Sequence, residues 1–132
     1  MIDFKKLLVW QKSSNLTHTV YKVTASFSRE FFRLRCKILH ACASIPALIA
    51  EGYSRNNNGE LKYCLNIAMD SVVELQYLLT HVYEQGIVSS SKYHQLTKDV
   101  IEVKNLLAER NEKLIAEKLQ ENIMSLVTNV ES

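Results

Sequence analysis

The sequence contains very few of the residues that interrupt secondary structure, with one proline and three glycines among 132 residues. A protein built from many short strands needs frequent turns, and glycine and proline are the usual turn formers. Their scarcity argues against a many-stranded sheet and favours long helices. The length indicates one domain, large enough to bury a core without metals or disulfides.

The features of secreted, zinc-binding and membrane proteins are also missing. The three cysteines form no C-x-x-C pair, so neither a disulfide framework nor a zinc site is predicted. The start, MIDFKKLLVWQ, lacks the apolar core of a signal peptide, and the longest apolar run, Ile38 to Ala50, is too short to cross a membrane. We therefore expect a cytoplasmic protein with no membrane partner.

The residue spacings that would indicate catalysis are absent too. A di-iron bundle needs Glu-x-x-His pairs, and the sequence has none. Cys36 and His40 are four residues apart, but no oxyanion element accompanies them, and there is no glycine-rich phosphate loop. We expect no enzymatic activity, no metal and no cofactor.

Four amphipathic helices are predicted from apolar residues that recur every three or four positions. Asp3 and Ser28 are the expected caps of the first two helices, and Asn57 the cap of the third, which should end at Gly86. The third helix has the most regular stripe: Leu61, Leu65, Ala68, Val72, Leu75, Leu79 and Val82. Short connections between such helices imply an all-α fold, an antiparallel up-and-down four-helix bundle.

The bundle is expected to occupy residues 1–112. Residues 113–132 keep apolar side chains at helical spacing, at Ile115, Leu119, Ile123, Leu126 and Val130. No glycine or proline separates this stretch from the fourth helix. It is predicted either to extend that helix or to form a separate tail helix.

The stretch SIPALIAEG, from Ser44 to Gly52, places the only proline inside a buried helix. Proline removes a backbone donor and clashes with the carbonyl four residues earlier, here that of Cys42, at a cost of about 3 kcal/mol unless the helix bends. A kink at Pro46 is therefore predicted. The small residues around it, Ser44 among them, would let the bent backbone lie close to a neighbouring helix.

Glu51 is expected to lie next to the apolar stripes of the same helix, where a partly buried carboxylate needs a partner. Arg55, four residues on, is the predicted partner. Glu74 in the third helix is a similar case. The structural interpretation is that these residues, with Gly52, fix the register of a helix or subunit contact; the alternative is that Glu51 contacts a ligand.

Charge is unevenly distributed along the chain. Up to residue 58 there are nine Lys and Arg against three Asp and Glu, and from residue 59 onward seven against eleven. The densest basic cluster is Arg29, Arg33, Arg35 and Lys37. On a continuous helix Arg29, Arg33 and Lys37 share one face, which predicts a phosphate-binding surface. The alternative is a solvated face that meets the acidic half of a neighbour.

Several of these stretches resemble one family. The opening F-x-x-L-x-V-W-Q, the elements SIPA and IAEG, and the helix that opens at Glu60 are similar to the proteins encoded in intervening sequences of bacterial 23S ribosomal RNA genes. The match runs from about Phe4 to Gly86. The resemblance implies a four-helix bundle assembled as a ring of five subunits, without known enzymatic activity.

The resemblance also extends to the accessory proteins of diversity-generating retroelements, which bind nucleic acid and a reverse transcriptase. This chain departs from the family pattern at several positions: two arginines are replaced by Leu39 and His40, an asparagine by Leu48, a glycine by Asp70 and an often basic residue by Tyr63. The loss of the two arginines weakens the expected phosphate binding. Fewer cations mean fewer phosphate contacts. The sequence predicts a homo-oligomeric scaffold that binds RNA or DNA through its basic face; the alternative is a protein-binding adaptor with no nucleic-acid role.

Overall fold

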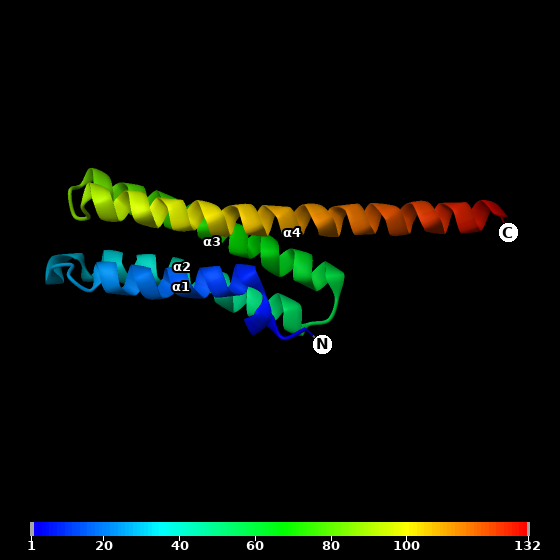
Figure 1. Cartoon of the computed structure of the whole chain (residues 1–132), viewed down its shortest axis with the longest axis horizontal. Helices are drawn as coiled ribbons and strands as arrows, with labels where there is room; N and C mark the ends of the chain where they lie inside the picture. Colours follow the sequence, from blue (N-terminus) through cyan, green and yellow to red (C-terminus); the bar gives the residue numbers. More distant parts are fainter. Residues whose placement is uncertain (1, 132) are drawn as a thin grey trace.

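The computed structural model describes residues 2–131, which fold as four long helices with two short 3₁₀ turns (Figure 1). The predicted four-helix bundle is confirmed. The elements in chain order are η1 (Phe4–Lys6), α1 (Leu8–Thr24), η2 (Arg29–Phe31), α2 (Phe32–Ser54), α3 (Asn58–Glu84) and α4 (Ser90–Glu131).

The helices run up and down in chain order, so that each packs against its two neighbours around the bundle. The α1–α2 and α3–α4 connections lie at one end, on the left of Figure 1, and the α2–α3 connection and the N-terminus at the other. Within residues 2–131, the diagonal pairs α1/α3 and α2/α4 have no Cα atoms within 8 Å of each other. This is the antiparallel arrangement that short connections favour.

The core is formed by one apolar stripe from each helix. All seven residues of the predicted α3 stripe are buried. From α2 the core receives Ile38, Cys42, Ile45 and Ile49, each of which is 0% exposed. From α1 the buried side chains include Leu16 and Val20, and from α4 Leu96, Val100, Val103 and Leu107. The spacing rule located the core because a helix that buries one face must repeat its apolar residues every three or four positions.

The caps of α3 are as predicted, whereas the starts of α1 and α2 differ. Asn57 Oδ1 accepts a hydrogen bond from the Glu60 amide at 3.0 Å, and Gly86 ends the helix with φ +74°, a conformation that suits glycine. Asp3 caps η1 rather than α1, because Leu7 is extended and α1 begins only after it. Ser28 likewise precedes the short turn η2, so α2 begins three residues later than expected.

Pro46 lies inside α2, which runs from Phe32 to Ser54 without a break in the helix. A bend at this point stays a prediction. Because Pro46 has no N–H, the Cys42 carbonyl loses its usual helical donor. The Thr17 hydroxyl of α1 donates to that carbonyl at 3.4 Å and also to the Ser13 carbonyl at 2.9 Å. An adjacent helix thus supplies a donor where the proline removes one.

Replacing Thr17 by valine tests this compensation. Valine keeps the shape of the side chain but leaves the buried Cys42 carbonyl without the hydroxyl donor, and we expect the free energy of unfolding to fall by about 1 kcal/mol. Denaturant unfolding measures the difference. Thr17→Ser, which keeps the hydroxyl, is the control and should retain the hydrogen bond; an equal loss in both variants would contradict this role.

The helix α4 is one continuous helix to Glu131, so residues 113–131 extend it instead of forming a separate helix. Among its side chains up to residue 130, the last buried one is Leu114. Figure 1 shows the remainder projecting beyond the bundle toward the C-terminus. No helix in residues 2–131 combines the length and apolar character that crossing a bilayer would take.

Candidate nucleic-acid interface

The predicted basic residues lie where η2 leads into α2, at the end of the bundle that carries the α1–α2 connection. Arg29, Arg33 and Lys37 are exposed. The ion pairs within residues 2–131 are Lys12–Glu102, Arg55–Glu51 and Lys113–Glu109, and none involves these three cations. Their charges are therefore not neutralised by any carboxylate in the described part of the chain.

Arg29 does not share a helix face with the other two in the predicted way. It belongs to the 3₁₀ turn η2, whereas Arg33 and Lys37 lie one turn apart on α2. The sequence reasoning assumed one helix from Ser28, and the three-residue turn changes the direction of the first side chain. Lys22, exposed in the last turn of α1, is a further cation at this end of the bundle that the sequence reasoning missed. That it lies at the same end as the start of α2 follows only from the fold.

Arg35 points toward α1 and holds the C-terminal end of that helix. Its Nε donates to Thr24 Oγ1 at 3.1 Å and its Nη2 donates to the Tyr21 carbonyl at 3.4 Å. Its guanidinium carbon lies 4.9 Å from the centre of the Tyr21 ring. Arginine satisfies terminal helix carbonyls in this manner. Part of the hydrogen-bonding capacity of Arg35 is therefore used within the bundle.

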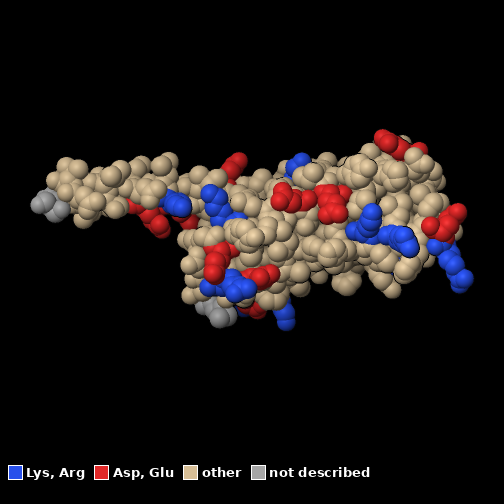
Figure 2. Space-filling view, turned by 180° about the vertical axis from the view of Figure 1, so that it is seen from behind, with Lys and Arg blue, Asp and Glu red and all other residues tan. Residues whose placement is uncertain are grey.

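The charges seen from behind do not form one continuous basic surface. In Figure 2 blue side chains occur at the end of the bundle opposite the projecting α4, and red side chains stand between them. A broad positive potential needs clustered charge of one sign. The arrangement can supply a few separate contacts to an anionic backbone rather than a wide basic groove.

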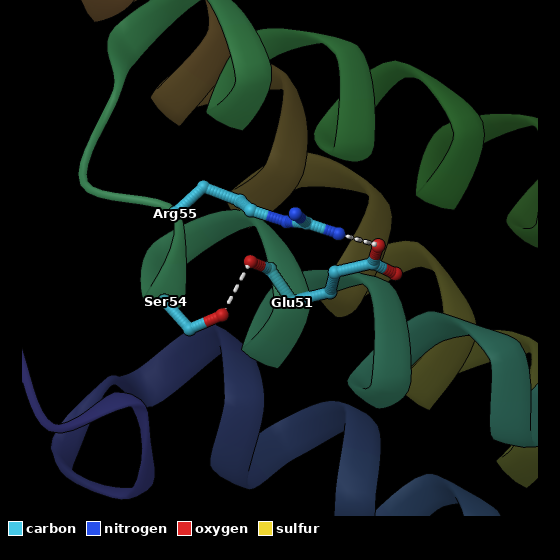
Figure 3. A network of polar contacts seen from close by, with 3 residues as sticks. All are labelled: Glu51, Ser54 and Arg55. Carbon is cyan, nitrogen blue, oxygen red and sulfur yellow. Dashed lines mark hydrogen bonds and ion pairs between the residues drawn. The ribbon is translucent and has the colours of Figure 1, made fainter.

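Glu51 and Arg55 form the predicted pair near the end of α2 (Figure 3). Arg55 Nη2 lies 3.0 Å from Glu51 Oε1, and the Ser54 hydroxyl donates to the Glu51 carbonyl at 2.8 Å. The carboxylate raises the pKa of Arg55 by hydrogen bonding and by its charge. The carboxylate is more exposed than expected: half of the Glu51 side chain is exposed, so the pair contributes little to stability.

Gly52 and Ser44, two of the small residues of this stretch, make different contacts. A Cβ atom at Gly52 would lie 2.9 Å from Cys64 Cβ and 3.0 Å from Leu61 Cδ1, so glycine allows α2 and α3 to approach closely. The hydroxyl of Ser44 donates to the His40 carbonyl at 2.6 Å within its own helix. Their predicted role in a subunit contact stays a prediction.

The outward face of α3 carries large side chains, of which the sequence analysis named only Tyr63, as a departure from the family pattern. Tyr63, Val73 and Tyr77 are 68%, 53% and 68% exposed. Together with Asn66 and Asp70 they follow steps of three and four residues, the same signal that located the core stripe. Glu74 lies exposed on this side of the helix, not partly buried as expected. Large apolar side chains left uncovered in a row are typical of a protein contact.

The groups that could perform catalysis are dispersed. In the part of the chain that the structure describes, no three His, Cys, Asp or Glu side chains gather as metal ligands. Cys42 is buried, and desolvation raises the pKa of its thiol to about 11 despite the hydrogen bond to Thr17. Burial likewise raises the pKa of Cys64. These two thiols stay protonated near neutral pH and are poor nucleophiles.

Comparison with known proteins agrees with this fold. A family model described as 23S rRNA-intervening sequence protein matches residues 5–109. A solved structure of a protein of unknown function from the S23 ribosomal protein family of Bacteroides thetaiotaomicron has a TM-score of 0.73 and 23% sequence identity, covering 79% of this chain and 98% of that chain. None of the curated proteins matches. The end of α4 lies beyond the family match.

Proposed function

The chain belongs to the family of 23S rRNA-intervening sequence proteins, and we propose that it acts in the cytoplasm as a non-enzymatic, homo-oligomeric scaffold that binds RNA or DNA. The contacts to nucleic acid come from Arg29, Arg33 and Lys37. Arg35 serves mainly to hold α1 against α2, with part of its guanidinium near the same surface. No metal or cofactor takes part.

The observation that carries this proposal is that three exposed cations at one end of the bundle have no carboxylate partner among the residues that the structure describes. Lysine and arginine bind phosphate oxygens, and such contacts position a protein on nucleic acid without reading its sequence. A few contacts of this kind give weak, salt-dependent binding, with dissociation constants of about 10⁻⁴ to 10⁻⁶ M. Leu39 and His40, which replace family arginines, make the surface smaller than the family pattern implies.

Charge reversal at the basic end tests the proposal. We expect Arg33→Glu/Lys37→Glu to bind structured RNA and duplex DNA at least about tenfold more weakly than the natural chain at low salt, because two phosphate contacts become repulsive. Fluorescence anisotropy with labelled nucleic acid measures the affinity. Lys62→Glu/Lys118→Glu changes the net charge equally at the other end of the bundle and should bind within about twofold of the natural chain.

Equal weakening by both variants would mean that only net charge matters, and the assignment to this end would fail. No binding by the natural chain in 50 mM salt would reject nucleic-acid binding altogether.

The outward face of α3 supports self-assembly. Tyr63 and Tyr77 are large, exposed and accompanied by Val73, and tyrosine is enriched in protein interfaces. A ring of five subunits is the assembly that the family resemblance implies. It would cover this face and account for apolar surface that a monomeric bundle leaves in water.

The same face supports the second candidate function, a protein-binding adaptor. Exposed Tyr63 and Tyr77 flank Asp70, so the surface could take a partner protein with apolar and basic side chains, such as a reverse transcriptase. Affinity capture followed by nuclease treatment separates the two functions. A protein partner that remains after nuclease treatment favours the adaptor, and one that is lost favours nucleic-acid binding.

A further inference from the structure

The projecting end of α4 has an apolar face that none of the described residues covers. Every side chain from Ile115 to Val130 is exposed, over a length of about 25 Å. In Figure 2 this end stands clear of the bundle and is mostly uncharged. Its large exposed apolar side chains are Ile115, Leu119, Ile123, Met124, Leu126, Val127 and Val130.

The spacing of these residues is that of a coiled coil. Ala116, Leu119, Ile123, Leu126 and Val130 follow one another in steps of three, four, three and four residues. In heptad positions a to g, this places Ala116, Ile123 and Val130 at a, and Leu119 and Leu126 at d. β-Branched residues at a with leucine at d favour two parallel strands.

The residues at positions a and d form the seam along which such a coiled coil would pair, and this seam points away from the bundle. The core stripe of α4 includes Val103, Leu107 and Leu114, and its heptad continuation falls on Glu117 and Glu121. Beyond Leu114 the seam lies two residues away from this continuation of the core stripe, which is roughly 200° around a helix with 3.6 residues per turn. The chain's own bundle therefore cannot cover the seam, and a second molecule has free access to it.

Charge favours an identical copy as that second molecule. Glu117, Lys118 and Glu121, the charged residues between Ile115 and Val130, all fall at positions b, c and f, on the outside of a pair. The positions that flank the seam hold uncharged side chains, among them Ile115, Gln120, Asn122 and Val127. Two copies of this helix can thus meet without placing like charges against each other.

Toward the bundle the same seam continues with Glu112 and Glu109, where two parallel copies would repel. Pairing would therefore begin at Ala116. Because each seam faces away from its own bundle, the two bundles lie on opposite sides of the pair.

We infer that the α4 extensions of two copies pair in parallel as a short two-stranded coiled coil from Ala116 to Val130. The apolar area available is on the order of 500–700 Å² for both helices, taking the half-exposed side chains of the seam and its flanks. This is below the ~1,000 Å² of a stable interface, so the pairing is reversible. It is independent of bundle assembly, and it would join two bundles or two rings at their ends.

Disulfide trapping tests the parallel register. In a parallel pair Val130 faces Val130 of the other copy, whereas antiparallel helices separate these residues. Val130→Cys in a Cys36→Ser background, where the remaining Cys42 and Cys64 are buried, should give a covalent dimer on oxidation with diamide. Thr128→Cys at the outward position f is the matched control and should form much less dimer. Equal dimer yields overturn the proposal.

Sedimentation over a concentration series tests the pairing without cross-linking. Leu119→Asp/Leu126→Asp puts charges into the seam and should raise the dissociation constant of the pair at least about tenfold. Ser125→Asp/Thr128→Asp adds the same charges on the outer face of the same helix and should change it by less than about twofold. Circular dichroism verifies that both variants keep the helix. An unchanged dissociation constant in the seam variant overturns the proposal and leaves bundle assembly untouched.

Discussion

Gly52→Ala is expected to lower the free energy of unfolding by about 1–3 kcal/mol, although alanine is the better helix former. The added methyl group would lie 2.9 Å from Cys64 Cβ and 3.0 Å from Leu61 Cδ1. Cys64 Cβ is attached directly to the α3 backbone and cannot turn aside, so α2 and α3 must separate. Thermal or denaturant unfolding measures the loss.

Ala47→Gly is the matched control for this substitution, since Ala47 is exposed in the same helix. With no packing to change, it should cost about 1 kcal/mol through helix propensity alone. If helix propensity alone determined the stability change at residue 52 as well, Gly52→Ala would stabilise the protein by about that amount. A stabilised Gly52→Ala variant would therefore contradict the close helix approach.

Leu65→Ala is expected to lower the free energy of unfolding by about 2–5 kcal/mol, the largest single effect that we predict. Leu65 is 0% exposed in the middle of the α3 stripe, and alanine would leave a cavity between packed helices. Denaturant unfolding at a fixed protein concentration gives the difference, because the stability of an oligomer depends on concentration.

Leu119→Ala makes the same chemical change outside the bundle. Leu119 is 59% exposed on the α4 extension, so the bundle should lose less than about 0.5 kcal/mol at a protein concentration too low for the extensions to pair. Similar losses at Leu65 and Leu119 would show that the extension is part of the cooperative core, against the predicted division near residue 112.

The core could be predicted from the sequence because its signal repeats many times. Leu61 to Val82 supplies seven apolar positions with helical spacing, and each added turn strengthens the same interpretation. The start of α1 could not be predicted, because one extended residue, Leu7, separates a capped 3₁₀ turn from the helix. Local choices of this kind depend on single backbone angles and carry no periodic signal.

The candidate site was predicted in composition but not in geometry. Arg33 and Lys37 are exposed one turn apart on α2 as expected, since a helix fixes that relation. The contacts of Arg35 with α1 could not be foreseen, because they join residues that only the fold brings together. The donation from Thr17 to the Cys42 carbonyl is another such contact; a proline inside a helix predicts only that a donor is missing.

The central claim, a bundle that assembles into a homo-oligomeric scaffold, is tested most directly by light scattering on the purified chain carrying Leu119→Asp/Leu126→Asp. These substitutions prevent the α4 extensions from pairing, so the mass reports the bundle alone. We expect a mass several times the 15.2 kDa of one chain, and five times if the ring implied by the family forms. Adding Tyr63→Asp/Tyr77→Asp should reduce that mass toward a single chain, because charges would replace the apolar centre of the α3 face. A mass of one chain before the tyrosines are changed would contradict the account.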